Sequence, residues 1–135
     1  AVHSFGHATG AVAHLPHGVT MNIFLPLIME YNLSKVEPLY KELLLELTDP
    51  EYFVSIADEN RGQESINYIY KLREELYNLC QLPYNLSQTN IDQKLISEIA
   101  KSAINDGSII VNPLEINLIE ANEILNKAWI AVNKI

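Results

Sequence analysis

Apolar residues recur at helical spacing along most of this chain. Two stretches carry stripes of apolar side chains three or four positions apart: Ile66, Ile69, Tyr70, Leu72, Leu76, Leu79 and Cys80, then Ile91, Leu95, Ile96, Ile99 and Ala103. Such spacing places side chains on one face of an α-helix. No segment alternates for long between apolar and polar residues, as a half-buried strand does. The pattern therefore predicts an all-α fold.

Proline, glycine and capping residues divide the sequence into six or seven predicted helices. Their approximate ranges are 1–13, 19–31, 35–47, 51–57, 62–80, 88–104 and 117–132. The turn at 105–107 is expected to lead into an extended segment at 108–113. The sequence shows no internal repeat, linker or low-complexity segment, so residues 1–135 are expected to form one domain.

Local signals mark several helix ends. Pro26 lacks a backbone donor and predicts a kink in the second helix. Ser34, with Glu37 at the capping-box position, predicts a new helix start, and Asn117 with Glu120 predicts the start of the last helix.

Composition limits the class of protein. Apolar residues make up 48% of the chain, which excludes intrinsic disorder. The formal net charge of -8 argues against a nucleic-acid partner, because phosphates bind to basic surfaces. The most apolar run, residues 18–29, is too short to cross a bilayer, and no basic segment precedes it as in a secretory signal. We expect neither a nucleic-acid nor a membrane partner.

The cysteine content indicates a compartment. Cys80 is the single cysteine and cannot form an internal disulfide, which is typical of a reducing environment. We therefore expect a cytoplasmic protein. Because Cys80 falls within the first apolar stripe, we expect a packed thiol rather than a nucleophile.

The densest candidate chemistry is a group of histidines, His3, His7 and His17, near the N-terminus. Imidazole is the commonest protein metal ligand and titrates near neutral pH. His3 and His7 lie four residues apart, about 6 Å along a helix, so helix geometry alone favours this pair as ligands. His3 and His17 would be about 21 Å apart on a straight helix and can share an ion only if the chain reverses. The break at 15–18 allows such a reversal.

Other observations limit this hypothesis. A His pair at four-residue spacing is more often structural or merely exposed than a binding site. Glu30 and Glu37 have no ligand-like spacing to the cluster, and His14 falls in the predicted loop with no partner at helical spacing outside the cluster. Because catalytic zinc sites commonly use three protein ligands, the sequence contains about half a metal site.

Three segments resemble the signature of iron-containing alcohol dehydrogenases: His3-Ser4-Phe5-Gly6-His7-Ala8-Thr9-Gly10, Pro16-His17-Gly18-Val19, and Leu25-Pro26-Leu27-Ile28-Met29-Glu30-Tyr31-Asn32. The C-terminal part is similar to that family's closing segment at Asp106, Asn112-Pro113, Ile124-Leu125 and Ala128. The resemblance covers essentially the whole chain and is strongest over residues 1–32.

The resemblance implies a two-domain parent enzyme. In that family an N-terminal α/β domain binds NAD(P) and supplies an Asp and a His to a divalent ion, and an all-helical C-terminal domain supplies the other two ligands. It thus implies that His3 and His17 bind Fe(II) or Zn(II), which replaces the His3/His7 pairing. His7 is then implied as a catalytic residue near the nicotinamide and substrate, where it relays a proton or positions the substrate. The ion would act as a Lewis acid during hydride transfer.

Departures from the family pattern also carry expectations. Thr9 stands where the family usually has Leu, and Met21-Asn22 where it often has Asn-Ala, which puts the substrate pocket in doubt. No glycine-rich phosphate loop and no Asp-x-x-x-His pair are present, so we expect no cofactor-binding residue in this chain.

We therefore expect residues 1–135 to be the helical metal-binding domain of a dehydrogenase whose nucleotide-binding domain is absent. Alone, the chain should be inactive and bind metal weakly. The implied partners are that domain, a small alcohol or aldehyde, and a second copy of the chain as a homo-oligomer. The alternative hypothesis is a non-enzymatic, truncated helical module for assembly or partner binding.

Overall fold

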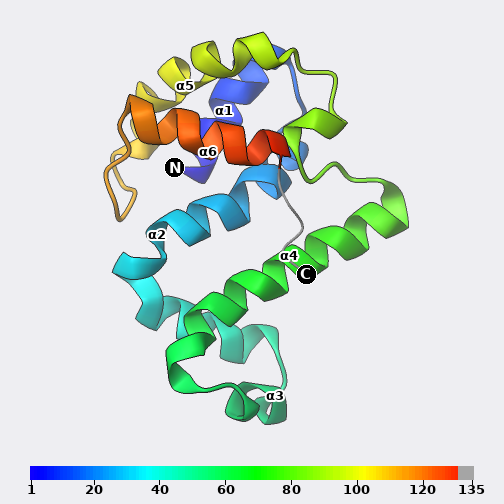
Figure 1. The fold of residues 1–135 in the computed structure, drawn as a ribbon, viewed down its shortest axis with the longest axis vertical. Helices are drawn as coiled ribbons and strands as arrows, with labels where there is room; N and C mark the ends of the chain where they lie inside the picture. The colour runs from blue at the N-terminus through cyan, green and yellow to red at the C-terminus, as the bar shows by residue number, and fades with distance from the viewer. Residues whose placement is uncertain (131–135) are drawn as a thin grey trace.

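The computed structural model describes residues 1–130, in which every regular element is a helix (Figure 1). The α-helices are α1 (Val2–Ala13), α2 (His17–Leu47), α3 (Pro50–Ser55), α4 (Arg61–Cys80), α5 (Ile96–Ile104) and α6 (Leu118–Ile130). Single 3-10 turns are η1 (Asp58–Asn60), η2 (Leu86–Gln88), η3 (Gln93–Leu95) and η4 (Gly107–Ile109). The predicted all-α fold with six or seven helices is confirmed.

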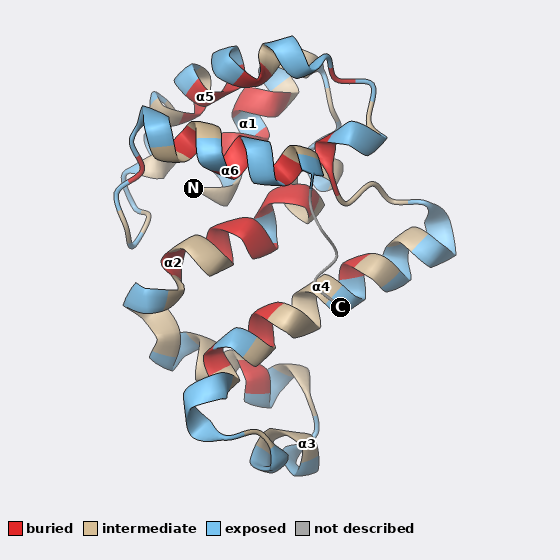
Figure 2. Ribbon diagram, viewed as in Figure 1, coloured by how far each residue is buried: buried red, intermediate tan, exposed pale blue. Residues whose placement is uncertain are grey.

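The helices form a body and an arm (Figure 1). α1, α5, α6 and the first half of α2 pack together, whereas the second half of α2, α3 and α4 extend away from them. The buried residues drawn in red in Figure 2 concentrate in the body. Its core joins these fully or nearly buried side chains: Phe5, Ala8, Ile23, Phe24, Leu27, Ile28, Leu86, Ile91, Ile96, Ile99, Ala100, Ala103, Ile116, Ala121, Ile124, Leu125 and Ala128.

The two helices predicted on either side of Ser34 form α2, which runs from His17 to Leu47 and joins two helices across a kink at Val36. The break thus lies two residues after the predicted helix start, and no kink occurs at Pro26. The dihedral angles of α2 stay helical at Pro26 and leave the helical region at Val36 alone (φ -126°, ψ 20°). Pro38 cannot donate a hydrogen bond to the carbonyl of Ser34, and its ring would collide with that carbonyl, so the helix opens between these two residues.

The predicted apolar face of α4 is only partly covered. Ile66 is buried, but Leu76 and Leu79 are exposed, the latter by 82%. The expectation of a packed thiol at Cys80 is wrong, because this residue is exposed at the end of α4. α2 and α4 diverge toward that end (Figure 1), where Leu76, Leu79 and Cys80 are exposed.

The C-terminal half differs from prediction in two places. α5 begins only at Ile96, because Asn85 and Gln88 form a capping box that closes the short turn η2 instead. The segment predicted as extended at 108–113 begins as the turn η4, since Asp106 accepts from the backbone of Ser108.

The predicted start of the last helix is confirmed. Glu120 N donates to Asn117 Oδ1 at 3.1 Å, and Asn117 N donates to Glu120 Oε2 at 2.8 Å. Its predicted end near residue 132 lies outside the described residues.

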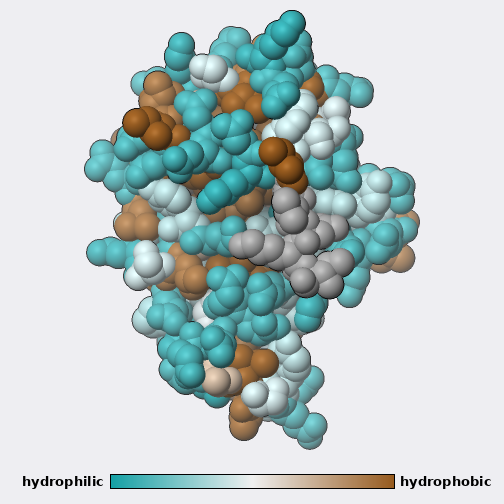
Figure 3. Space-filling view, viewed as in Figure 1, coloured by the Kyte–Doolittle hydropathy of each residue, from teal (hydrophilic) through white to brown (hydrophobic). Residues whose placement is uncertain are grey.

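The visible surface is mainly hydrophilic, and its apolar side chains form separate small patches (Figure 3). Within residues 1–130, no helix is both long and apolar enough to cross a bilayer.

Candidate metal centre

The structure brings the three N-terminal histidines together at the start of α1 and α2. The ring centres of His3 and His17 are 5.4 Å apart, those of His3 and His7 are 5.7 Å apart, and those of His7 and His17 are 5.8 Å apart. All three side chains are exposed. The chain therefore makes the reversal that a shared ion at His3 and His17 requires.

Local backbone chemistry explains the reversal. α1 ends at His14, which adopts a left-handed conformation (φ 56°) and donates its N–H to the carbonyl of Gly10. Pro16 then precedes α2 in an extended conformation, and its carbonyl accepts from Thr20. His14 is thus a helix-ending residue, and its side chain is exposed.

Small residues let α1 and α2 approach each other. A Cβ on Gly6 would overlap the end of Met21 and lie 3.0 Å from Thr20 Oγ1. A side chain at Gly6 would thus displace the end of Met21 and crowd Thr20, so the glycine favours the close approach of α1 and α2 that brings His3 and His17 together.

His7 has a carboxylate partner from a distant part of the chain. Its Nδ1 lies 3.0 Å from Asp106 Oδ2. The other oxygen, Oδ1, accepts from the backbone N–H and the hydroxyl of Ser108. Hydrogen bonds from Ser108, and then from His7, lower the pKa of Asp106 to about 2. An ionised carboxylate can only accept, so the contact requires a proton on Nδ1 of His7, and the tautomer with this proton has its lone pair on Nε2.

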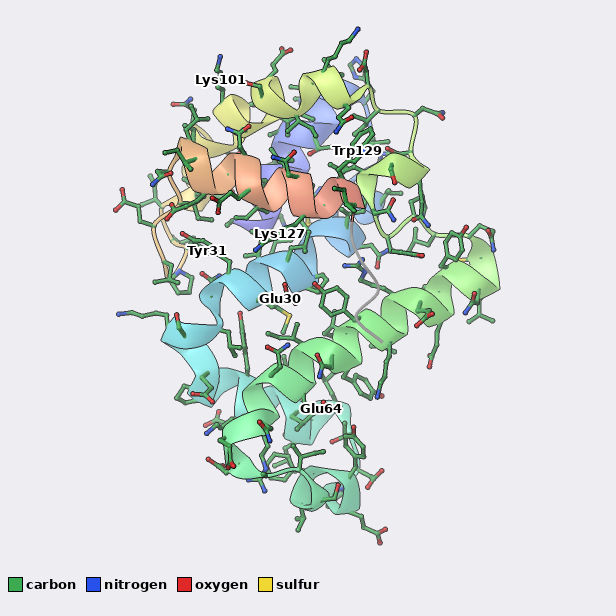
Figure 4. All side chains as sticks on the ribbon, viewed as in Figure 1. Glu30, Tyr31, Glu64, Lys101, Lys127 and Trp129 are labelled. Atoms are coloured by element: carbon green, nitrogen blue, oxygen red, sulfur yellow. The ribbon has the colours of Figure 1, made fainter. Side chains whose placement is uncertain are left out.

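The segment that carries Asp106 is fixed to α2. Asn32 and Asn112 exchange two amide hydrogen bonds of 2.9 Å, and Tyr31 donates to the carbonyl of Glu115 at 2.6 Å. In Figure 4, Tyr31 points toward the segment before α6, whereas Glu30 points toward α4. The motif residues Tyr31 and Asn32 therefore hold the Asp106 segment in place.

Sequence reasoning gave Asp106 and Ser108 no role. Ninety-nine positions separate Asp106 from His7, so no local spacing could reveal the contact. The available signal was the similarity of Asp106 to the closing segment of the family.

The Asp106 contact is expected to stabilise the chain at neutral pH and to lose its effect in acid. The pKa of Asp106 is lower in the folded chain than its ordinary value, so its contribution is present above pH ~4 and disappears as the pH falls toward ~2. Asp106→Asn should lower the free energy of unfolding by on the order of 1 kcal/mol at pH 7, after allowance for solvent screening. Urea unfolding of both proteins across this pH range measures the difference.

The matched control for this experiment is Glu75→Gln, which neutralises an exposed carboxylate on α4. Its unfolding curve should follow that of the parent chain. A difference between parent and Asp106→Asn that grows as the solution is acidified would contradict the assigned contact.

Thr9, Met21 and Asn22, which depart from the family pattern, make contacts within this domain. Thr9 is fully buried, and its hydroxyl donates to the carbonyl of Phe5 at 2.7 Å. Asn22 donates to the carbonyl of Pro83 at 2.8 Å, and Met21 lies at the Gly6 crossing. The Thr9 hydrogen bond lies within α1, whereas Asn22 and Met21 contact other elements of the domain.

The other acidic candidates lie elsewhere. Glu37 is paired with Lys41 on the arm. Glu30 interacts with Tyr70 of α4, where burial and then Glu30 raise the pKa of the tyrosine. As the side chains stand, no three His, Cys, Asp or Glu residues within residues 1–130 form a group that could hold a metal ion.

The His3–His17 pair nevertheless fits two ligands of one ion. Imidazole nitrogens bind zinc at about 2.0–2.1 Å, which separates the centres of two rings on a tetrahedral ion by about 5 Å. The observed separation of 5.4 Å is close to this value. Neutral imidazole is also a suitable donor for both iron and zinc.

Comparison with known proteins identifies the family. The family model described as "Fe-containing alcohol dehydrogenase family, C-terminal" matches residues 1–129. The chain belongs to this family of iron-containing alcohol dehydrogenases. It corresponds to the C-terminal part of these enzymes.

Relatives in the iron-containing alcohol dehydrogenase family are moderately similar. The chain is 29% identical over 126 residues to the NADPH-dependent butanol dehydrogenase of Clostridium saccharobutylicum, covering 90% of this chain and 30% of that protein. It is 25% identical over 128 residues to the lactaldehyde reductase of Escherichia coli strain K12, covering 95% and 32%. The chain thus spans less than a third of the length of these two relatives.

Solved structures in this family share the fold. A crystal structure of 1,3-propanediol oxidoreductase superposes with a TM-score of 0.84 at 22% identity, covering 95% of this chain and 32% of that chain. An alcohol dehydrogenase from Oenococcus oeni superposes with a TM-score of 0.75, also at 22% identity. At this identity the likeness establishes the helical architecture alone.

Proposed function

We propose that this chain is the metal-binding part of an NAD(P)-dependent alcohol dehydrogenase or aldehyde reductase that uses Fe(II) or Zn(II). The observation that carries the proposal is the 5.4 Å separation of His3 and His17 in a chain of this family. A divalent ion held there would supply Lewis-acid chemistry to the oxygen of a substrate alcohol or aldehyde.

The residues of this chain would have separate roles in metal binding and proton transfer. His3 and His17 would hold the ion through one ring nitrogen each. His7 would act on the reacting groups, because Asp106 fixes its Nδ1 and leaves Nε2 to accept or return a proton. Asp106, which Ser108 holds in place, is a positioning residue for His7.

The remaining parts of the proposal concern the whole protein. The names of relatives include butanol and 1,3-propanediol dehydrogenases and a lactaldehyde reductase, which supports a small alcohol or aldehyde as substrate. NAD(P) and the remaining metal ligands would come from a preceding nucleotide-binding domain, the principal partner of this one. Because two imidazoles leave most of the coordination shell to water, the chain alone should bind metal weakly and show no turnover.

Metal titration tests the proposal. We expect Zn(II) titrated calorimetrically into the chain to bind with a dissociation constant in the micromolar range, and His3→Ala and His17→Ala each to weaken binding by about 10-fold or more. His14→Ala is the matched control, because it removes an exposed histidine of the same segment and should leave the affinity unchanged. Equal affinities in all four proteins would overturn the proposal and favour the non-enzymatic helical module.

A further inference from the structure

A series of hydrogen bonds joins the turn that carries Asp106 to the first turn of α1. Ser4 Oγ lies 2.9 Å from Ser108 Oγ. The Ser108 hydroxyl also contacts Asp106 Oδ1, and the other carboxylate oxygen, Oδ2, lies 3.0 Å from His7 Nδ1. Because Ser4 and His7 are three residues apart on α1, the helix holds this turn at two neighbouring points.

The carboxylate of Asp106 fixes the direction of each hydrogen bond in the series. An ionised carboxylate only accepts, so the single proton of the Ser108 hydroxyl points to Asp106. The Ser108 oxygen then accepts from Ser4, whose hydroxyl is the donor in the 2.9 Å contact. Ser4 therefore holds Ser108, and Ser108 and His7 hold the two oxygens of the carboxylate.

We infer that Ser4 is a positioning residue for His7, because it holds Ser108 and thereby the carboxylate that keeps the proton of His7 on Nδ1. The inference rests on the role in proton transfer proposed above for His7. The side chain of Ser4 is fully buried, whereas that of His7 is half exposed. Ser4 would thus act on Nε2 of His7 only through Ser108 and Asp106.

The second buried hydroxyl of α1 shows that the contact made by Ser4 is not required by burial alone. A buried hydroxyl needs a hydrogen-bond partner, because an unpaired one is unfavourable. Thr9 is as fully buried as Ser4, and its hydroxyl donates to the carbonyl of Phe5 within the same helix. Ser4 instead reaches Ser108 in the turn η4, so its hydroxyl links two elements of the domain.

Loss of the Ser4 hydroxyl would change which nitrogen of His7 carries the proton. Ser108 would still contact Asp106 within the turn, but the turn would lose one of its attachments to α1. The carboxylate could then move away from Nδ1, and a neutral imidazole can carry its proton on either nitrogen. With the proton on Nε2, His7 could not accept a proton from the substrate at that atom.

The tautomer of His7 gives a readout that a purely structural role of Ser4 would not change. Nitrogen-15 NMR of the imidazole rings distinguishes the two tautomers in the metal-free chain at pH ~8.5, where histidine rings are ordinarily neutral. We expect mainly the Nδ1–H tautomer in the parent chain. Ser4→Ala should lower the ratio of Nδ1–H to Nε2–H by about 2- to 10-fold, the effect of losing one hydrogen bond.

Matched variants test whether the hydroxyl of Ser4 is responsible. Thr9→Val deletes the other fully buried hydroxyl of α1 and should leave the ratio unchanged. Ser4→Cys keeps the shape of the side chain with a weaker donor, so it should give an intermediate ratio. Circular dichroism of each variant confirms that it is folded. An unchanged ratio in Ser4→Ala, or an equal fall in Thr9→Val, would overturn the inference.

A double variant tests whether Ser4 acts through Ser108. Adding Ser4→Ala to Ser108→Ala should lower the ratio no further, and a second fall of the same size would contradict the inferred route. Asp106→Ala separates the inference from the proposed function. If Asp106→Ala lowers the ratio and Ser4→Ala does not, this inference alone fails. If neither lowers it, the role proposed for His7 fails as well, and the metal titration described above still tests the ion site independently.

Discussion

Replacing Phe24 with alanine is expected to lower the free energy of unfolding by about 3–5 kcal/mol. Phe24 is fully buried in the body, with its ring centre 5.4 Å from that of Phe5. The substitution removes buried apolar surface and leaves a cavity where α2 packs on α1. Because small domains are stable by only about 5–15 kcal/mol, this loss is a large fraction of the total. Chemical denaturation followed by circular dichroism measures it.

Leu39→Ala is the matched control for Phe24→Ala. Leu39 lies on the same helix but is 61% exposed, so its truncation should change stability by no more than about 0.5 kcal/mol. A loss below about 1 kcal/mol for Phe24→Ala would show that the body is not packed around the α1–α2 contact.

Replacing Arg73 with alanine should cost about 3–4 kcal/mol, the second largest effect that we expect. Its guanidinium is buried and donates to the carbonyls of Ile23 in α2 and Tyr84 in the following loop. It also lies over the ring of Tyr70, 5.0 Å from the ring centre. Truncation would leave two carbonyls without these donors and remove the contact that joins α4 to α2 and to the loop.

Arg73→Met separates hydrogen bonding from packing. Methionine fills much of the same volume, so its loss of about 1–3 kcal/mol would reflect the two carbonyl contacts. Burial lowers the pKa of Arg73, and its Nε has no hydrogen-bond partner among residues 1–130, so the buried charge itself opposes folding. A methionine variant as stable as the parent would contradict our view that the hydrogen bonds outweigh this penalty. Lys71→Ala, on the same helix but exposed, is the control.

Helix ends were predictable where the signal is local. The Asn117–Glu120 capping box formed as expected because its two hydrogen bonds need only residues of one turn. Ser34 with Glu37 carries the same signal, yet the break in α2 lies at Val36 instead. There α4 crosses closely, since a Cβ on Gly62 would lie 2.8 Å from Glu37 Cγ and 3.2 Å from Leu33 Cδ1. α4 therefore packs on residues on both sides of the kink, and such packing cannot be seen from the sequence.

The sequence shows which apolar residues share one face of a helix more readily than it shows whether other elements bury that face. The spacing of Leu72, Leu76 and Cys80 predicts a buried side of α4, but all three residues are exposed, and the buried positions of the helix are Gly62, Ser65, Ile66 and Arg73. The candidate metal centre likewise combines residues that the sequence reveals with a contact that it does not reveal. Three histidines near the N-terminus could be found by inspection, whereas the partner of His7 is supplied by a turn at the other end of the chain.

The uneven placement of the core has a consequence for local unfolding. None of the buried members of the main core lies between residues 29 and 85, where the buried apolar side chains are Met29, Leu44 and Ile66. Opening the arm exposes little apolar surface, so it requires less free energy than opening the body. Amide hydrogens of the arm can thus exchange through partial unfolding that leaves α1 and the first half of α2 intact. The arrangement of His3, His7 and His17 would therefore persist while the arm opens and closes.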